Sequence, residues 1–437
     1  MAPETIALVS VFVVFGLIVM GVHVGITLAA ISVLGVWAIT GKAMVALNIL
    51  QTTAYSAVMD YVFAVVPLFV LMGLFATMAG ATRDLFNAAQ FFLGRVKGGM
   101  GIATVIANAV FAAITGVSVA SAAVFSKIAY PEMKRLKYDK KFGLGIVAGS
   151  AILGMLIPPS VLMIVYGVVT EQGIGKLFIA GIVPGLVVTA VLSIGIRTMI
   201  HFRPALGGVL DQGQPFTLRN AARAAGGCWA VVLLILMVLG GIWGGLVTPT
   251  EAGAVGAAGG FLLIVMKRKL NWPDLWQLLL DGGQTTASIF LLLICAQMYS
   301  RMLTISGLAS RISEGATTLP VPPWVIIAGF IVVFLILGCI IDSTSIILLT
   351  IPIMHPVAVK LGYDPIWFTI VSIVTIEIGL LTPPFGMVVF AMKSSLGDEA
   401  KIEEIFAGST PFLLMLLIAL AIILTFPILS TWLPSLM

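Results

Sequence analysis

Two short polar clusters interrupt the apolar stretches of this chain, and both carry oxygen atoms that can bind cations. Ser118 and Ser121 lie in TGVSVAS, and the run Asp342 to Ser345 lies in IDSTS. A Pro-Pro pair follows each cluster, at Pro158 and at Pro383. A proline within a helix cannot donate to the carbonyl four residues earlier, which then needs another partner. The carbonyls freed in this way belong to Gly154, Met155, Gly379 and Leu380.

A hard monovalent cation such as sodium, or a proton-carrying water, would satisfy such carbonyls. Asp342 strengthens this interpretation, because a carboxylate between apolar runs is costly in a membrane and marks a functional site. The structural alternative is that Asp342 or Ser343 caps a helix. Helix N-termini also attract the carboxylate of a substrate, so the two clusters indicate a site for sodium and an organic anion.

The two clusters belong to an internal repeat in which Ser343 corresponds to Ser118, 225 positions earlier. Interrupted hydrophobic segments at corresponding places of two halves point to a transporter binding site. A simple proline kink explains either break alone, but explains the duplicated pair poorly. At this offset the chain repeats Ser118, Ile128, Pro131, Leu136, Tyr138, Asp139, Gly154, Leu156, Pro158 and Pro159 as Ser343, Ile353, Pro356, Leu361, Tyr363, Asp364, Gly379, Leu381, Pro383 and Pro384.

The composition sets the class of protein that must position these residues. The chain has 437 residues, of which 60% are hydrophobic and 9% charged, and such a composition predicts an all-α polytopic membrane protein. Its net charge of +5 is concentrated in loops between apolar stretches, as the positive-inside rule predicts, so we expect no nucleic-acid partner. Spans are predicted at 5–22, 25–41, 53–79, 174–197, 226–246, 250–266, 277–303 and 409–433.

The densest basic loop, Lys127 to Lys141, is assigned to the cytoplasm. Counting spans from it places the N-terminus in the periplasm, although Lys42 then lies in an outer loop. Segments 99–130 and 323–354 each begin and end on one side in this topology. They are therefore predicted to be re-entrant hairpins that enter from opposite sides, which makes the two halves inverted.

Segments 83–97 and 308–318 mix charged with apolar residues at helical spacing, which predicts helices along the membrane surface. They are either plain loop helices or rigid arms that clamp a mobile unit. The predicted organisation is N-terminal scaffold helices (1–79), a first arm (80–97), repeat 1 (98–170), scaffold helices with a cytoplasmic linker (171–303), a second arm (304–322), repeat 2 (323–400) and a C-terminal helix (401–437).

Two further carboxylates lie in apolar surroundings. Glu251 follows Thr248 at a predicted helix start, where a capping role is favoured. Glu377, two residues before Gly379, is harder to assign to a structural role. The alternative of a polytopic membrane enzyme requires a nucleophile with a base, and Ser118 has no His or intramembrane Lys neighbour in its segment. We therefore predict no enzyme activity, no catalytic residue, no organic cofactor and no metal other than sodium.

Several motifs together resemble the large membrane subunit, called M or DctM-like, of tripartite ATP-independent periplasmic (TRAP) transporters. The resemblance covers the whole chain. The motifs are GVSVASAAVFSKIAYPEM (Gly116 to Met133), IPPS (Ile157 to Ser160), TPTEAGAVG (Thr248 to Gly256), GYD (Gly362 to Asp364) and EIGLLTPPFG (Glu377 to Gly386).

This resemblance implies a sodium-coupled importer of the bacterial inner (cytoplasmic) membrane, with the inverted-repeat, elevator-type fold of an ion-transporter superfamily. It implies a separate four-helix Q subunit, a periplasmic substrate-binding P subunit, a small organic anion as substrate and contact with membrane lipid. The alternative within transporters is a stand-alone ion-coupled anion carrier. The substrate itself, among dicarboxylates, sialic acids, keto acids, sulfonates and compatible solutes, is left open.

The resemblance also assigns residues to at least two sodium ions and to the substrate. The first sodium site comprises Gly116, Ser118, Ser121, Gly154, Ile157 and Pro158. The second comprises Asp342, Ser343, Ser345, Gly379, Thr382 and Pro383. The substrate is expected between the two polar tips, near Ser118, Ser121, Thr344, Pro159 and Pro384.

Overall fold

The computed structural model describes residues 2–59, 61–209, 217–318 and 320–437, and these residues form helices without any strand. Within these described ranges, six helices are long and apolar enough to cross a membrane, or up to eight if each of two bent pairs counts as one span. The all-α, multi-span prediction is therefore confirmed. Part of the predicted cytoplasmic linker, residues 210–216, lies outside the described residues.

The N-terminal helices follow the predicted spans except at the third. The chain begins with α1 (Pro3–Val19) and α2 (Val24–Thr40). The predicted span 53–79 is instead divided into α3 (Ala43–Met59), the 3-10 turn η1 (Tyr61–Ala64) and α4 (Val65–Met78). Pro67 explains the restart, because its ring and missing N–H are tolerated in the first turn of a helix but not in its interior.

Two amphipathic helices occupy the predicted arm positions. α5 (Ala81–Leu93) buries one face, which includes Leu85 and Phe86, and packs against the first hairpin. α17 (Leu308–Thr318) packs against α1 and the second hairpin. Their positions relative to a membrane stay a prediction.

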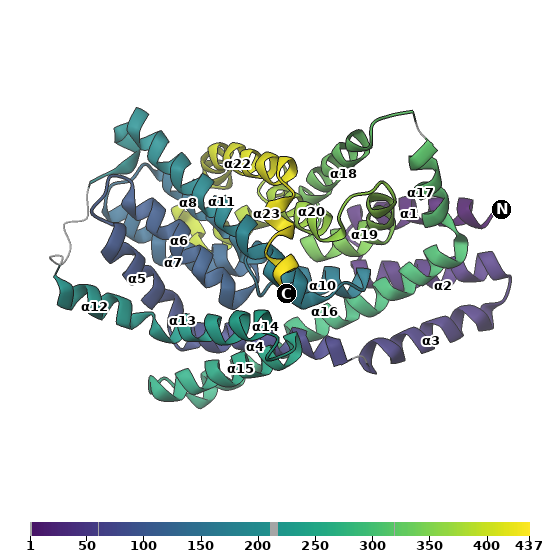
Figure 1. Cartoon of the computed structure of the whole chain (residues 1–437), viewed down its shortest axis with the longest axis horizontal. Coiled ribbons are helices and arrows are strands. Elements are labelled where there is room, and N and C mark those ends of the chain that lie inside the picture. Colours follow the sequence, from purple (N-terminus) through teal and green to yellow (C-terminus); the bar gives the residue numbers. More distant parts are fainter. Residues whose placement is uncertain (1, 60, 210–216, 319) are drawn as a thin grey trace.

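Long helices form the rest of the predicted scaffold. α11 (Ile174–Phe202) leads through η2 (Pro204–Gly207) to α12 (Leu218–Gly227). The next span comprises α13 (Trp229–Ile235), the π-helical turn η3 (Leu236–Gly240) and α14 (Gly241–Trp243). α15 (Pro249–Met266) and the long α16 (Trp272–Ser306) complete this part. Figure 1 shows α4 and α15 running side by side, with α12 and the N-terminus at opposite ends of the molecule.

Glu251 has the capping role that the sequence favours. Its carboxylate accepts hydrogen bonds from the backbone N–H of Thr248 (2.7 Å) and from the Thr248 hydroxyl (2.9 Å). The backbone N–H of Glu251 donates in return to the Thr248 hydroxyl. This reciprocal capping box begins α15 and gives Glu251 a structural function.

The two repeats have the same order of helices. Repeat 1 contains the hairpin α6 (Gly99–Thr115) and α7 (Ser118–Arg135), followed by α8 (Lys140–Ala151), α9 (Leu153–Leu156) and α10 (Val161–Thr170). Repeat 2 contains the hairpin α18 (Pro323–Gly338) and α19 (Ser343–Lys360), followed by α20 (Pro365–Gly379), α21 (Met387–Leu396) and the 3-10 turn η4 (Gly397–Glu399). Each hairpin packs against the second half of the other repeat's broken helix, α7 against α21 and α19 against α10.

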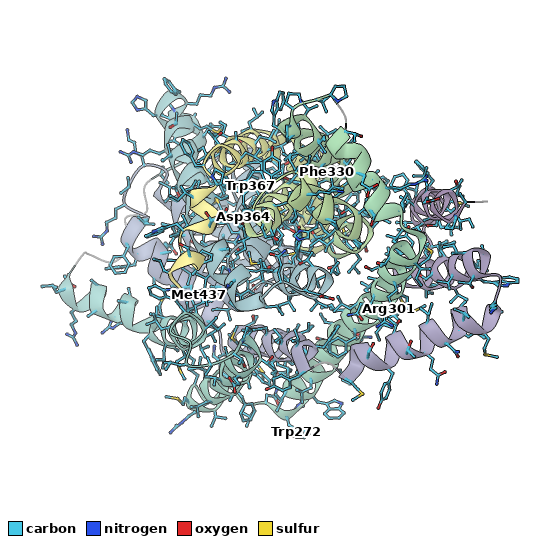
Figure 2. All side chains as sticks on the ribbon, turned by 45° about the vertical axis from the view of Figure 1, so that its right-hand side comes forward. Trp272, Arg301, Phe330, Asp364, Trp367 and Met437 are labelled. Atoms are coloured by element: carbon cyan, nitrogen blue, oxygen red, sulfur yellow. The ribbon has the colours of Figure 1, made fainter. Side chains whose placement is uncertain are left out.

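The repeat extends to side-chain packing at the turn after each hairpin. Asp139 accepts from the backbone N–H of Phe142 (2.9 Å), and Asp364 accepts from that of Trp367 (2.9 Å), so corresponding residues cap α8 and α20. The preceding tyrosines stack on corresponding rings, Tyr138 on Phe142 and Tyr363 on Trp367. Figure 2 shows Asp364 and Trp367 next to each other at this end of α20.

The C-terminal helix begins before the predicted span 409–433. α22 (Ile402–Thr425) packs against α8 and α11. It ends before Pro427 because the residue preceding a proline is disfavoured in helical conformation. A short α23 (Ile428–Thr431) and η5 (Pro434–Leu436) follow, so the predicted span 409–433 is shifted and divided.

Candidate functional site

The first hairpin tip lies directly on the first helix break. Gly116, with φ of +62°, makes the turn between α6 and α7, and a Cβ there would approach the carbonyl oxygen of Pro159 to 2.6 Å. A Cβ on Gly154 would lie 2.7 Å from the Cα of Ser118. The backbone N–H of Val161 donates to the Gly116 carbonyl (3.4 Å). Both glycines are therefore required by close backbone contact.

The second tip and the second break meet through another pair of glycines. Gly338 ends α18 and Gly379 ends α20, and a Cβ on either would lie 2.6 Å from the Cα of the other. The structure thus brings each predicted tip to its own break, as the repeat predicts.

The carbonyls that the prolines free are largely satisfied within the protein. The Met155 carbonyl accepts from the Ser160 hydroxyl (2.5 Å). The Gly379 carbonyl accepts from the N–H of Thr382 (2.9 Å), and that of Leu380 from the N–H of Val388 (3.4 Å). The expectation that all four carbonyls need an external partner is therefore wrong for these three. The sequence could not show it, because a proline indicates which hydrogen bond is lost and not which donor replaces it.

Glu377 joins the two hairpin tips. Its carboxylate is fully buried, with an exposed fraction of 0%. Oε1 accepts a hydrogen bond from the Ser343 hydroxyl (2.8 Å), and Oε2 accepts one from the Ser118 hydroxyl. Ser118 Oγ also lies 3.4 Å from the Ile152 carbonyl. One carboxylate therefore connects corresponding serines of two hairpins that are far apart in the sequence.

The environment of Glu377 is chemically unusual. No Lys, Arg or His of the described ranges forms an ion pair with it, and its two donors are neutral hydroxyls. A buried carboxylate is costly unless a counter-charge and hydrogen bonds compensate it. A bound cation or a proton would supply that charge. The sequence marked Glu377 as an intramembrane carboxylate, but it did not predict the contact with both tips.

Asp342 forms the N-cap of α19, the structural role considered for it from the sequence. It accepts hydrogen bonds from the backbone N–H (3.0 Å) and from the hydroxyl of Ser345. Asp342 is half-buried and Thr344 likewise, whereas Ser345 is buried. A cap at the tip does not conflict with cation binding, because one carboxylate oxygen can accept more than one contact.

Ser121 is the predicted site residue whose environment best fits a ligand role. It lies in the first turn of α7, is fully buried, and its hydroxyl meets no hydrogen-bond partner within the described part of the chain. Buried hydroxyls are normally hydrogen-bonded. An additional ligand at this position would satisfy Ser121.

The two breaks differ in their cover. Pro158 and Pro159 are buried, and Ile157 packs into the space left by Gly185 of α11. Pro383 and Pro384 are exposed, as is Phe385, and Thr382 donates its hydroxyl to the Ile378 carbonyl (3.0 Å). The predicted site residues therefore gather at two tips of unequal exposure.

A cavity of about 470 Å³ separates the end of α10 from α16. Glu171 and Gln172 line one side, and Gln297, Ser300 and Arg301 line the other. Gln172 also donates to the hydroxyl of Thr369 on α20 (3.2 Å). Figure 2 shows where Arg301 lies on α16. The cavity lies between repeat 1 and a scaffold helix and carries a cation suited to carboxylate binding.

Comparisons with known proteins agree along the whole chain. The family model described as "Tripartite ATP-independent periplasmic transporter, DctM component" matches residues 11–429. The C4-dicarboxylate TRAP transporter large permease protein DctM of Pseudomonas aeruginosa is 35% identical over 379 residues, 86% of either chain. The sialic acid TRAP transporter large permease protein SiaM of Vibrio cholerae is 30% identical over 428 residues, 98% of either chain.

A solved structure has the same fold. The Alcanivorax borkumensis YdaH transporter matches with a TM-score of 0.61 at 18% identity, over 89% of this chain and 88% of that one. At this identity the likeness concerns the fold alone, and it confirms the predicted transporter fold class.

Proposed function

This chain belongs to the DctM family of tripartite ATP-independent periplasmic transporters, and we propose that it imports small organic anions together with sodium. The relatives are permeases rather than enzymes, and their names include C4-dicarboxylate and sialic acid, both carboxylates. Carboxylates, with sulfonates as the related acid class, are therefore the proposed substrates.

The observation that carries the sodium coupling is the contact of Glu377 with Ser118 and Ser343. Each serine belongs to one of the two proposed sodium sites, so the Glu377 carboxylate contacts a proposed ligand of each site. A sodium ion at either tip compensates the charge of Glu377, and its release leaves that charge uncompensated. The orphaned hydroxyl of Ser121 supports the first site, and the capping carboxylate of Asp342 supports the second.

We propose that the two repeats move as one body against the remaining helices, which is an elevator mechanism. The contacts of each hairpin with the other repeat's broken helix support a single mobile unit. Arg301, in the cavity between α10 and α16, is the proposed contact for the incoming anion. The proposed topology keeps the basic loops in the cytoplasm and the N-terminus in the periplasm.

A separate four-helix membrane subunit and a periplasmic binding protein are the proposed partners. Reconstitution tests the whole proposal: proteoliposomes would contain this chain with both partners, and uptake of succinate and of sialic acid would be measured with inward sodium or potassium gradients. We expect uptake of one of these acids with sodium only, and only when the binding protein is present. Equal uptake in potassium would refute sodium coupling, and sodium-driven uptake without the binding protein would indicate the stand-alone carrier.

A further inference from the structure

A second cavity lies where the start of the first hairpin meets the end of α11. Its volume is about 380 Å³, and Lys97, Arg197 and His201 line it together with Thr198 and Ile200. Lys97 comes just before the hairpin helix α6, whereas the other four residues belong to the last turns of α11. Among the described residues that line this cavity, none is acidic. Basic groups from two separate elements therefore converge on one space.

Close packing holds these two elements together. Gly98 has φ of +78°, and a Cβ there would approach Cδ1 of Ile200 to 2.6 Å. Gly101, one turn further along α6, faces α11 in the same way, since a Cβ there would lie 3.2 Å from Cγ2 of Ile196. The two glycines let α6 lie directly against α11. The backbone of Lys97 is therefore held beside α11 by packing and needs no ion pair to bring it there.

The basic groups of this cavity have no counter-charge within the described part of the chain. Lys97, Arg197 and His201 form no ion pair or side-chain hydrogen bond there. The Thr198 hydroxyl donates to the Ile194 carbonyl of its own helix (2.8 Å), so the donors left for a ligand are the basic groups. Cations near the C-terminus of α11 also complement the helix dipole, but this role does not explain Lys97 on another element.

An exposed apolar stripe leads along α11 to the cavity. Leu186, Ala190 and Ile194 are exposed at four-residue spacing, and Arg197 and His201 continue the same face of the helix. Leu186 is 60% exposed and Ile194 65%. A rise of about 1.5 Å per residue places Arg197 about 16 Å from Leu186 along the helix, which is about half of a hydrocarbon core about 30 Å thick. The stripe therefore has the length of one lipid leaflet, with its basic end at the depth of the headgroups.

We infer that this cavity binds the phosphate headgroup of an anionic phospholipid, with an acyl chain along the apolar stripe of α11. Basic residues at the cytoplasmic surface attract such headgroups, and a guanidinium pairs with phosphate oxygens through parallel N–H donors. The cytoplasmic position rests on the proposed topology, whereas lipid binding does not depend on sodium coupling. A bound headgroup links the start of the first hairpin to α11, and this link restrains the proposed movement between them.

The test measures lipid retention by the purified chain. Native mass spectrometry would compare phosphatidylglycerol with phosphatidylcholine, which has no net charge, and with inorganic phosphate, which has no acyl chain. We expect phosphatidylglycerol to be retained preferentially. Arg197→Gln and Lys97→Gln should each weaken its binding about fivefold, because one basic residue near an anionic membrane surface contributes about this factor. Arg197→Lys keeps the charge and should retain most of the binding.

Arg203→Gln is the matched control, because Arg203 is exposed at the same end of α11 but does not line the cavity. It should retain phosphatidylglycerol as the wild type does. If Arg203→Gln weakens binding as much as Arg197→Gln does, or if neither Arg197→Gln nor Lys97→Gln changes it, the site is overturned. Equal retention of phosphatidylcholine or of inorganic phosphate would overturn the assignment to an anionic lipid. Melting temperatures equal to that of the wild type would show that the fold of each variant is intact.

Discussion

Replacing Glu377 with Gln should make sodium much less effective in driving uptake. The substitution keeps the side-chain length, but it removes the charge and turns one of the two acceptors into a donor. Ser118 and Ser343 then lose the charged acceptor that holds both hydroxyls. A hydrogen bond to a charged group contributes about 1 kcal/mol more than a neutral one, so two such bonds are worth about 2 kcal/mol.

An energy of about 2 kcal/mol corresponds to about a thirtyfold change in an equilibrium constant. Because each serine is a ligand in one of the two proposed sodium sites, this factor is the product of about fivefold at each site, and the half-saturating sodium concentration for uptake should rise about fivefold. Labelled-substrate uptake into proteoliposomes, measured over a range of sodium concentrations at constant ionic strength, gives this value directly. Glu377→Asp, which is one methylene shorter and cannot reach both hydroxyls at once, should also raise it.

Glu251→Gln is the control for the loss of a carboxylate in an apolar helix. Gln replaces Glu in capping boxes, so α15 should keep its N-terminus and sodium dependence should not change. If Glu377→Gln shows the sodium dependence of the wild type, the carboxylate has no part in coupling. The proposal that it senses both tips would then be refuted.

Three other substitutions test the tips and the topology. Gly154→Ala should lower the free energy of unfolding by about 1–3 kcal/mol and reduce uptake, because the new Cβ would lie 2.7 Å from the Cα of Ser118. Gly329→Ala is the control, because a Cβ at Gly329 meets no atom within 4 Å. Equal melting temperatures for the two variants would contradict the close contact at Gly154. Asp342→Ala should cost about 1 kcal/mol through loss of the α19 cap and should also weaken sodium dependence, so that an unchanged sodium response would leave the residue as a cap only. Lys134→Cys should react with a membrane-impermeant thiol reagent from the cytoplasmic side, and labelling from outside would invert the proposed topology.

The helices and breaks could be predicted from the sequence because their signals are local. Apolar runs of helical length mark the spans, and the Pro-Pro pairs at Pro158 and Pro383 interrupt the helices in which they lie. The offset of the repeat also predicted that Ser118 and Ser343 correspond, and these two serines begin α7 and α19. Boundaries were less predictable: Pro67 lies within a continuous apolar stretch, so the division between α3 and α4 was missed.

The contacts between the repeats could not be predicted from one sequence. Glu377 lies 259 positions from Ser118, and nothing in either segment specifies that they meet. The same is true of the donors that satisfy the freed carbonyls, such as the Ser160 hydroxyl on Met155, because a proline shows which bond is lost but not which one replaces it. The sodium and substrate assignments are still predictions.

The unequal cover of the two proline breaks bears on how a duplicated chain can face two directions. If both repeats were packed alike, turning the molecule over in the membrane would give the same arrangement. The two repeats would then have no difference in packing to exchange. Here Pro158 is buried and Ile157 packs against Gly185 of α11, while Pro383 and Phe385 are exposed. This one conformer thus shows the Pro-Pro break in two environments, one in each repeat. We expect the opposite-facing conformer to form when each repeat adopts the packing that the other repeat has here.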